Sequence, residues 1–426
     1  MRGLFEDLQW RGLVHQLTDA ETLPRLLDED VLVAYIGFDP TADSLHIGHL
    51  LQLCLLRRIQ EAGHRPIALV GGGTGMVGDP SGRSDERSLL TPEQLEVNKA
   101  GMCAQLERFL DFGAGPNPAI LADNADWLAE TRLLDFLRDV GKLFTVNEMV
   151  RKEAVRARLE EREHGISFTE FSYMLLQAWD FLQLFDRYEC RLQLGGSDQW
   201  GNITEGVDLI RRRRNAEAFG LTSPLVTKAD GTKFGKTESG NVWLDPARTS
   251  HYQFFQYWIR TSDAEVGSYL RTFTFLDRPA ILELDRATAS HPERREAQRI
   301  LAREVTALVH GADAAAQAER AAAVLFTEAV TELDEAALDN GLAGAPSTAV
   351  RAGDLDRGLS VVDALVMTGL ASSKGEARRA LQGGGVYVNN VRVPVDRSLS
   401  ASDLLPGGRI LLRRGRAEHH VLVVKK

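Results

Sequence analysis

Apolar positions in the first part of the chain change between two periods. Residues 31–38, VLVAYIGF, are short, continuous and β-branched, which predicts a buried strand. From about Gly48 to Glu61, leucines and an isoleucine recur at helical spacing, and Gly63 is placed to end that helix. Residues 66–73, PIALVGGG, predict the next strand. Strand, helix and strand in this order form a βαβ unit, which implies parallel strands and a right-handed crossover.

The same alternation continues to about Leu225. Thr91 and Pro92 are placed as the capping and first residues of a helix, with a glutamine three places after the threonine. Alternating strands and helices predict a doubly wound α/β domain with a Rossmann-like parallel sheet over residues 1–225. Its further elements are strands over 118–123 and 190–196 and helices over 127–141, 168–185 and 197–214.

Beyond residue 246 the pattern changes from alternating elements to helices. From about His251 to Ala329 no convincing strand occurs, so residues 247–345 predict an α-helical domain. Residues 346–357 belong to a stretch of small and polar residues, which predicts a linker. Residues 358–426 combine two short helices with strand-and-turn pieces and predict a small α+β domain.

Composition narrows the class of protein. With 426 residues two or three domains are expected, and 44% hydrophobic with 26% charged residues is ordinary for a soluble globular protein. No apolar run of about eighteen residues occurs, so no membrane partner is expected. The N-terminus has no apolar signal core and the three cysteines are widely spaced, so we expect reduced thiols and a cytoplasmic location.

Charge is unevenly distributed along the chain. Residues 358–426 carry 11 Lys and Arg against 5 Asp and Glu, a net of +6, so the rest of the chain carries −16 of the total of −10. An acidic body repels a polyanion, so we expect any nucleic acid to be held by local basic patches such as this tail. A tail that is basic by chance is the alternative.

Two histidines mark the start of the first predicted helix. His46 and His49 are three residues apart, so they share one face of its first turn. A metal site, a polar helix start without function and an anion site are the competing interpretations. A metal needs a further ligand, which no nearby pattern supplies. A helix N-terminus after a parallel strand offers N–H groups to a phosphate, imidazole N–H groups can add to them, and Gly48 leaves room for a nucleotide.

A second candidate is the segment TKADGTKFGKTESG. Its glycines predict a mobile loop over residues 226–246, and Lys228, Lys233 and Lys236 make that loop cationic. Two lysines three residues apart on such a loop suit a charge clamp that closes on a pyrophosphate group. A solvated polar loop is the alternative.

The two segments together resemble the signatures of class I aminoacyl-tRNA synthetases: HIGH at 46–49, and KFGKT at 233–237 in its tyrosyl form. The stretches YIGFDPTADSLHIGHL, GGGTGMVGDPSGR, GISFTEFSYMLLQAWDF and LQLGGSDQWGNI resemble the bacterial tyrosyl-tRNA synthetase family. The resemblance covers essentially the whole chain, and the tail is similar to the S-four-like RNA-binding domain of ribosomal proteins. It implies activation of tyrosine with ATP, giving tyrosyl-adenylate and pyrophosphate, and transfer of tyrosine to the 3′ end of its tRNA.

The resemblance implies a site that stabilises phosphate charge rather than one that supplies a nucleophile, because the attacking carboxylate is already ionised. Mg²⁺ is expected with ATP, held mainly by the phosphates, and no tightly bound cofactor is expected. The implied catalytic residues are His46, His49, Thr41, Arg83, Arg87, Lys233, Lys236 and Thr237. ATP is also expected to contact Gly37, Asp39, Gly48, Gly196 and Asp198.

The resemblance further implies a tyrosine pocket. A buried acceptor for the phenolic O–H is left unpaired when phenylalanine enters, so discrimination is expected without an editing domain. Tyr173, Gln177 and Asp180 are four and then three residues apart, which places them on one helix face and favours a shared pocket. Tyr35 and Asp180 match the phenol site, Asp79, Tyr173 and Gln177 the amino-group pocket, and Gln199 the carboxyl end.

The expected partners are L-tyrosine, ATP, the tyrosine tRNA and a second copy of the chain in a homodimer. Three other functions are considered: a tryptophan enzyme of the same fold, an RNA-binding protein that has lost catalysis, and a metal-dependent hydrolase that uses the two histidines. Tyr35 and Asp180 speak against tryptophan, and intact signatures speak against lost catalysis. The sequence assigns no role to EREH at 161–164. The residues expected to contact RNA are Lys374, Arg378, Arg379, Asn389 and Arg392.

Overall fold

The computed structural model describes residues 3–425 except 80, 82–89, 153–154, 157–158, 160–165, 227–233, 238–239, 327–329, 333–334, 336–337, 339–341, 343–344 and 416–417. The chain forms two compact units. The first comprises Met1–Asp245 and Ser262–Ser290, and the second Pro246–Thr261 and His291–Lys426. The helices after residue 247 therefore do not form one block, because Ser262–Ser290 belongs with the α/β part.

A six-stranded sheet forms the centre of the first unit. Its strand order is β1-β6-β5-β2-β3-β4, with β2 to β6 parallel and β1 antiparallel at the edge. This arrangement confirms the predicted Rossmann-like sheet. The strands are β1 Gln16–Leu17, β2 Val33–Phe38, β3 Arg65–Val70, β4 Ile120–Asp123, β5 Cys190–Gly196 and β6 Phe219–Ser223.

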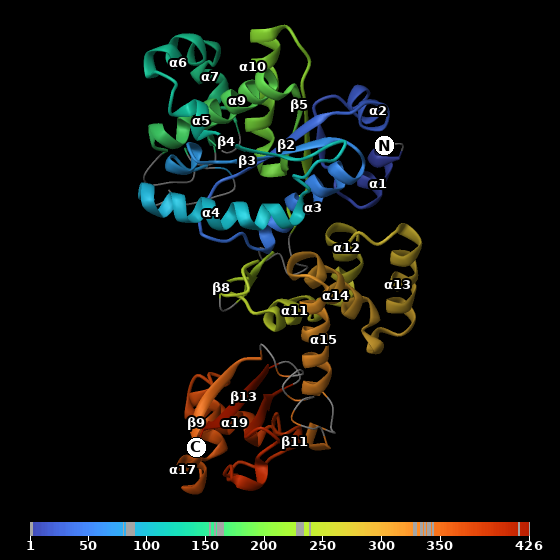
Figure 1. Ribbon diagram of the computed structural model, residues 1–426, viewed down its shortest axis with the longest axis vertical. Coiled ribbons are helices and arrows are strands. Elements are labelled where there is room, and N and C mark those ends of the chain that lie inside the picture. Colours follow the sequence, from blue (N-terminus) through green and yellow to red (C-terminus); the bar gives the residue numbers. More distant parts are fainter. Residues whose placement is uncertain are drawn as a thin grey trace. The chain divides into compact units, whose positions relative to one another are not determined.

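Helices cover both faces of this sheet, with α3 and α4 on one side of the strands and α9 and α10 on the other (Figure 1). Phe181 and Leu184 of α9 share a buried core with Ile67 and Leu69 of β3. The helices of the first unit are α1 Leu4–Trp10, α2 Thr22–Glu29, α3 Ile47–Glu61, α4 Pro92–Phe109, α5 Ala125–Leu128, α6 Leu133–Asp139, α7 Val146–Met149, α9 Phe168–Tyr188, α10 Trp200–Arg214, α12 Asp263–Phe273 and α13 Arg278–Ser290. Its 3₁₀ helices are η1 Thr74–Met76, η2 Gly141–Leu143 and η3 Ser197–Gln199.

The helix ends show how local sequence sets this arrangement. Thr91 caps α4, since its Oγ1 accepts a hydrogen bond from Gln94 N at 3.2 Å, as predicted. Gly63 follows α3 with φ +99°, a left-handed conformation that glycine adopts without strain. The single helix predicted over 127–141 is wrong: it is divided between α5 and α6, because Arg132 is extended and Thr131 Oγ1 donates to Trp127 O at 2.7 Å.

The second unit contains a group of helices and a separate five-stranded sheet. Helix α11 packs against α14 and α15, as expected for a helical domain. The helices of the second unit are α11 His251–Ile259, α14 Glu296–His310, α15 Ala312–Phe326, α17 Ala352–Asp356, α18 Val361–Met367 and α19 Lys374–Gln382. Its 3₁₀ helices are η4 Pro292–Arg294, η5 Val330–Glu332 and η6 Ala401–Asp403.

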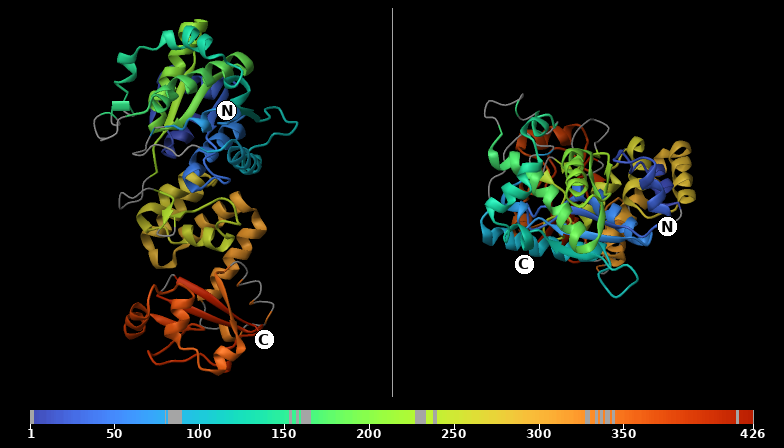
Figure 2. Two further views of the ribbon diagram at one scale, coloured as in Figure 1. Left: turned by 90° about the vertical axis from the view of Figure 1, so that its left-hand side faces the viewer. Right: turned by 90° about the horizontal axis from the view of Figure 1, so that it is seen from above.

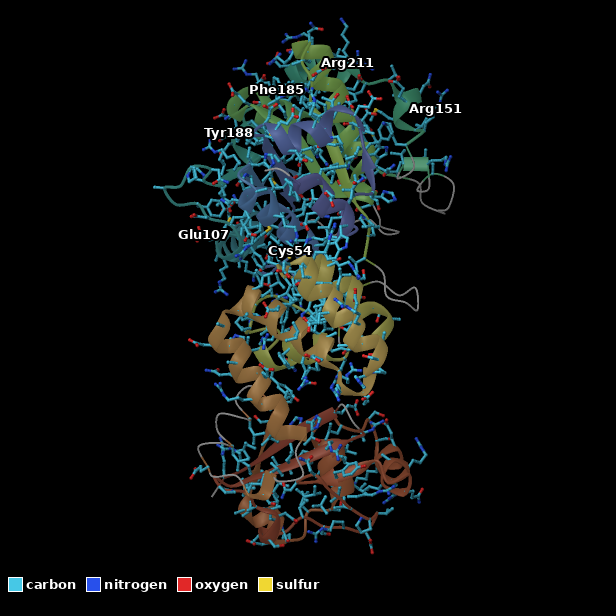
Figure 3. All side chains as sticks on the ribbon, turned by 90° about the vertical axis from the view of Figure 1, so that its right-hand side faces the viewer. Cys54, Glu107, Arg151, Phe185, Tyr188 and Arg211 are labelled. Carbon is cyan, nitrogen blue, oxygen red and sulfur yellow. The ribbon has the colours of Figure 1, made fainter. Side chains whose placement is uncertain are left out.

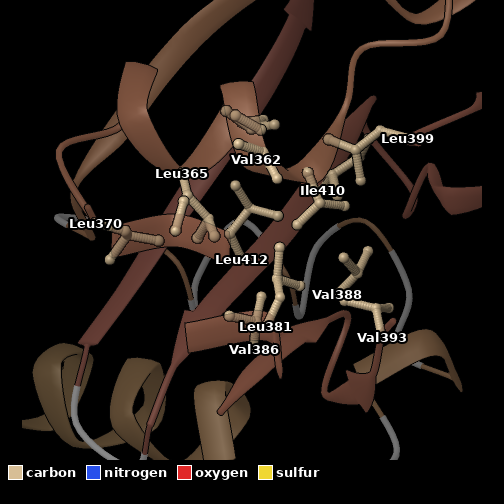
Figure 4. Close-up of a cluster of buried hydrophobic side chains, with 14 of the residues drawn as sticks. Val362, Leu365, Leu370, Leu381, Val386, Val388, Val393, Leu399, Ile410 and Leu412 are labelled. Atoms are coloured by element: carbon tan, nitrogen blue, oxygen red, sulfur yellow. The ribbon is translucent and has the colours of Figure 1, made fainter. Parts of the chain in front are cut away.

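The C-terminal sheet has the strand order β11-β10-β12-β13-β9. Helices α18 and α19 cover one face, where Leu365 and Leu381 meet Val386, Ile410 and Leu412 in a buried cluster (Figure 4). The two longest strands, β12 and β13, can be followed in dark red in the left view of Figure 2. The strands are β9 Ser347–Arg351, β10 Val386–Val388, β11 Val391–Arg392, β12 Arg409–Arg414 and β13 Glu418–Lys425.

The linker predicted over residues 346–357 is wrong. Ser347–Arg351 forms β9, which pairs in parallel with β13, and Ala352–Asp356 forms α17. The small and polar residues of this segment suit an edge strand, because only one side of it needs a partner. Among the residues that the structure describes, no helix is long and apolar enough to cross a membrane.

Candidate active site

The order of the first sheet reverses at β2 and β5. From β2 the chain continues outward through β3 and β4, whereas β5 and β6 lie on the opposite side of β2. Open α/β sheets bind ligands in the crevice at the carboxyl ends of strands at such a point. Gly37, near the end of β2, is exposed, and a side chain there would meet no atom within 4 Å. The segments that follow β2 and β5 carry most of the predicted site residues.

His46 and His49 cap the N-terminus of α3 with their rings. His46 Nδ1 accepts a hydrogen bond from Gly48 N at 3.1 Å, and His49 Nδ1 accepts one from His46 N at 3.2 Å. The ring centroids are 4.0 Å apart. Since both Nδ1 atoms accept, the neutral rings carry their hydrogen on Nε2, which is the atom able to donate to an anion.

Gly48 is required by His46 itself. A Cβ at Gly48 would lie 2.7 Å from His46 Cε1 and 2.8 Å from its Nδ1. The glycine therefore makes room for the folded-back imidazole, which is a different reason from the predicted room for a nucleotide.

The second signature approaches the first in the structure. Strands β7 Lys236–Thr237 and β8 Gly240–Asn241 form a hairpin. After it, Trp243 forms an antiparallel bridge with His46, and Ile47 N donates to Val242 O at 3.0 Å. Gly235 has φ +86°, and a Cβ there would lie 3.0 Å from Ile47 Cγ1. The hairpin is thus joined to the first turn of α3 by backbone pairing.

Helix α12 supports the start of this hairpin. Phe234 stacks on Phe273, with ring centroids 5.2 Å apart and an interplanar angle of 8°. The end of α12 is held by two buried arginines: Arg58 donates to Thr274 O, and Arg11 donates to the same oxygen at 3.3 Å. Burial lowers the pKa of Arg58 to about 10, so the guanidinium is still charged at neutral pH. The carbonyl oxygens at the C-terminus of a helix favour this positive charge.

Several predicted phosphate-side residues lie outside the described residues. These are Arg83, Arg87, Lys228 and Lys233. The stretch EREH at 161–164, to which the sequence assigned no role, also lies outside the described residues. For Lys236 and Thr237 the structure gives only the backbone position in β7. Thr41 is exposed just before α3, and its N–H donates to Asp39 O at 2.8 Å.

Asp180 lies at the bottom of the predicted phenol site. It is 2% exposed and accepts hydrogen bonds from Trp127 Nε1 at 2.7 Å and from Asn124 Nδ2 at 2.9 Å. Burial raises the pKa of this carboxyl to about 7, although the two donors act in the opposite direction. Tyr35 packs on Phe181, and burial and the nearby Asp180 charge raise its pKa well above the usual range.

The hydroxyl of Tyr35 is buried and has no hydrogen-bond partner among the described residues. Gln193, the neighbour of Tyr35 in the β2–β5 register, likewise has a buried Oε1 without a described partner. Orphaned buried polar atoms are rare because each costs free energy. A polar ligand group beside Tyr35 would remove that cost, as the predicted phenol contact requires.

Asp39 joins the phosphate side to the amino-acid side. It accepts from Tyr173 Oη at 3.0 Å and from Thr74 Oγ1 at 2.8 Å. Thr74 accepts in turn from Asn124 at 2.9 Å, so the network continues to Asp180. Asp39, predicted to contact ATP, is therefore tied to two residues predicted for the tyrosine pocket.

The predicted amino-group residues form a second network. Gln199 Nε2 donates to Asp79 Oδ2 at 2.7 Å, and Gln177 Nε2 donates to Gln199 Oε1 at 3.2 Å. Asn202 Nδ2 donates to Gln177 Oε1 at 2.9 Å and closes the group. Three carboxamides and a carboxylate are held in one place, which is the chemistry that a ligand ammonium and carboxylate need.

Gly196 is the last residue of β5, and Asp198 follows it. A Cβ at Gly196 would lie 2.5 Å from Asp198 Oδ1, so the glycine lets this carboxylate fold over the strand end. Burial raises the pKa of Asp198. Both residues lie at the carboxyl end of β5, and their contact with a ribose stays a prediction.

Four residues of these networks were not predicted: Thr74, Asn124, Trp127 and Asn202. Asn124 comes directly after β4, at the carboxyl edge of the sheet, and that position is a signal that sequence reasoning can use. Trp127 has no such signal, because an aromatic residue on a short helix most often belongs to the core.

In the C-terminal sheet domain, the predicted RNA contacts separate into two kinds. Lys374, Arg378 and Arg379 are exposed on α19. Asn389 is buried, donates to Asp403 O at 2.7 Å and accepts from Leu411 N at 2.9 Å. Its side-chain amide is thus engaged in the fold, and its predicted RNA contact stays a prediction. Arg392 is exposed and donates to Gly383 O at 3.3 Å.

Comparison with known proteins agrees with this geometry. Residues 27–327 match the family described as tRNA synthetases class I (W and Y), and residues 337–422 match the tyrosine–tRNA ligase SYY-like C-terminal domain. The chain therefore belongs to the class I aminoacyl-tRNA synthetases of the tryptophan and tyrosine group. Within that group, the relatives that it matches over nearly its whole length are tyrosine–tRNA ligases.

The chain is 54% identical to the tyrosine–tRNA ligase of Roseiflexus castenholzii, over 99% of each chain. It is 51% identical to the tyrosine–tRNA ligase of Geobacillus stearothermophilus, over 98% of this chain and 99% of that one. The crystal structure of a C-terminally truncated mitochondrial tyrosyl-tRNA synthetase from Aspergillus nidulans matches with a TM-score of 0.69 and 34% identity, over 76% of this chain and 94% of that chain.

Proposed function

We propose that this class I synthetase is a tyrosine–tRNA ligase in which Tyr35 and Asp180 select the substrate by its phenolic hydroxyl. The observation that carries the proposal is the buried Tyr35 Oη, which has no partner among the residues that the structure describes and lies near the buried Asp180 carboxylate. A tyrosine phenol can accept from the Tyr35 hydroxyl and donate to Asp180, which already accepts from Trp127 and Asn124. Phenylalanine would leave the buried Tyr35 hydroxyl unpaired, at a cost of about 1–3 kcal/mol, and would give Asp180 no further donor.

For the phosphates, we propose charge stabilisation by the two capping histidines and the hairpin. The Nε2–H groups of His46 and His49 and the N-terminus of α3 together offer donors to an anion. Lys236 is proposed to add its charge from the hairpin, because residues 242 and 243, directly after the hairpin, pair with residues 46 and 47. Mg²⁺ is proposed to arrive with ATP and to be held mainly by its phosphates.

ATP–pyrophosphate exchange tests this function. The protein is assayed in parallel with tyrosine, tryptophan and phenylalanine. Exchange with tyrosine alone is expected, and Tyr35→Phe is expected to raise the relative rate with phenylalanine while leaving the ATP KM unchanged. Exchange with tryptophan would contradict the assigned pocket, and no exchange with any of them would leave only the RNA-binding alternative.

We further propose that the chain works as a homodimer through an exposed apolar patch. The patch consists of Leu133, Leu134, Leu137, Val146 and Phe168, and Phe168 and Leu134 are both 77% exposed. Its three elements share one small core, since Phe136 of α6 and Phe171 of α9 both pack against the buried cluster that contains Met149 of α7. Contiguous exposed apolar side chains of this kind mark protein interfaces.

Light scattering after gel filtration tests the homodimer. Phe168→Asp with Leu134→Asp should convert a dimer-sized parent to a monomer. Val31→Asp is the matched control, because Val31 is 61% exposed but lies outside the patch. A monomer-sized parent, or a control that dissociates equally, would contradict this interface.

The basic tail is proposed to contact the tyrosine tRNA through Lys374, Arg378 and Arg379. All three side chains are exposed on one short helix, although Lys374 also forms an ion pair with Asp363 at 2.6 Å. A cytoplasmic location is proposed with this function. It is supported by the three unpaired cysteines, of which Cys54, labelled in Figure 3, is fully buried.

A further inference from the structure

Ser44 and Gln105 form a buried junction just before the first signature. Gln105 projects from α4, where its Oε1 accepts from Leu45 N at 2.8 Å and its Nε2 donates to Ser44 Oγ at 3.0 Å. Ser44 Oγ donates to Leu45 O at 2.7 Å. Ser44 is 3% exposed and Gln105 is 7% exposed, so these hydrogen bonds do not compete with bulk water.

The same junction receives the strand that returns from the hairpin. Asp245 N donates to Ser44 Oγ at 3.2 Å, and Leu244 N donates to Leu45 O at 2.8 Å. Ser44 Oγ therefore joins three separate segments: α4, the residues before α3, and the residues after the hairpin. The backbone pairing of residues 242 and 243 with 46 and 47 continues directly from this point.

We propose that Ser44 and Gln105 are positioning residues for adenylate formation. They hold the base of the hairpin against the start of α3, so that Lys236 meets the phosphates beside His46 and His49. This inference rests on the proposed phosphate role of the hairpin. Neither Ser44 nor Gln105 is given any contact with substrate; both act through the backbone that they hold.

The size of the expected effect follows from what each substitution leaves behind. Ser44→Ala removes the hydroxyl oxygen that accepts from Asp245 N and from Gln105 Nε2, which favours a shifted hairpin base. A displacement of about 1 Å in a catalytic group can cost about 10²-fold in rate. Tyrosine is bound by separate networks, around Asp180 and Gln199, so its affinity should not change.

The test compares Ser44→Ala and Gln105→Leu with the parent in pyrophosphate exchange. We expect kcat to fall by about 10- to 100-fold, with KM for tyrosine within about twofold of the parent value. Gln60→Leu is the matched control. Gln60 is also a helical glutamine that bridges a loop, accepting from Asp111 N at 2.9 Å and donating to Asp111 O at 2.7 Å, but it lies at the other end of α3. Its kcat should equal that of the parent.

A double-mutant cycle with Lys236→Ala separates positioning from general destabilisation. If Ser44 acts through the hairpin, Ser44→Ala should slow the parent but add little once Lys236 is absent. Equal slowing in both backgrounds, or a lower melting temperature with unchanged kcat, would overturn the inference. An unchanged rate for Lys236→Ala alone would instead overturn the proposed role of the hairpin, so the two failures are distinguishable.

Discussion

The indole N–H of Trp127 donates to Asp180 Oδ1 at 2.7 Å and ties the segment after β4 to helix α9. The carboxylate proposed to recognise tyrosine is thus oriented from one side by Trp127 and from the other by Asn124. Both hydrogen bonds favour the charged form of Asp180, against the burial that raises its pKa to about 7. In the proposed function, substrate selection would therefore depend on residues that neither signature contains.

Trp127→Phe should weaken tyrosine binding. The substitution keeps an aromatic ring but removes one donor to a buried carboxylate. A hydrogen bond to a charged group contributes about 1.5–3 kcal/mol, so we expect tyrosine affinity to fall by about tenfold or more, with ATP affinity unchanged. Calorimetric titration measures both, and Trp10→Phe serves as the control. Equal losses for tyrosine and ATP would show a general disturbance instead.

Tyrosine binding should depend on pH through Asp180. Its pKa is raised to about 7 in the folded protein, so the carboxyl is neutral below that value and ionised above it. Because an ionised carboxylate is the stronger acceptor for a phenol, affinity should rise between about pH 6 and pH 8. Asp180→Asn should bind weakly and show no rise over this range.

The same shift predicts a pH dependence of stability. An acid whose folded pKa lies above its unfolded value stabilises the fold fully below the unfolded pKa, and this contribution is lost as pH rises through the folded pKa. The free energy of unfolding should therefore fall between about pH 4 and pH 7 in the parent more than in Asp180→Asn. Urea unfolding at several pH values measures the difference, and parallel curves would contradict it.

Gly48→Ala should slow activation without destabilising the protein. The new Cβ would lie 2.7 Å from His46 Cε1, so the ring has to leave its capping position. Alanine is otherwise better than glycine inside a helix by about 0.5–1 kcal/mol, so the melting temperature should stay close to that of the parent. We expect adenylate formation to slow by about tenfold or more in a rapid-quench experiment. Gly375→Ala on α19, where the nearest atom is 3.7 Å away, is the control.

Asn389→Ala should destabilise the C-terminal sheet domain rather than remove a contact with RNA. It loses the acceptor for Leu411 N and the donor to Asp403 O, which together should cost about 1–3 kcal/mol. Arg378→Ala with Arg379→Ala should keep the melting temperature, weaken tRNA binding and reduce its salt dependence. Unchanged melting for Asn389→Ala with weaker tRNA binding would instead support the predicted RNA contact of Asn389.

Local patterns predicted the parallel sheet and the long helices because each carries its own periodicity. They failed where a distant partner decides the structure. The small and polar residues of β9 indicate a strand only when β13 is beside them, and Arg132 breaks a helix that its neighbours favour. In the site, the spacing on α9 predicted a shared pocket, and the resemblance named the residues. The histidine caps, the Asn124 and Trp127 hydrogen bonds and the Ser44 junction depend on side-chain geometry that no spacing encodes.

The parallel pairing of β9 with β13 also sets where the C-terminal domain can be separated from the rest. A fragment that begins at Gly358 would lack β9 and would leave one whole edge of β13 unpaired. Such an exposed strand edge can pair with another molecule, so the fragment should self-associate. A fragment that begins before Ser347 keeps this edge covered and should remain monomeric.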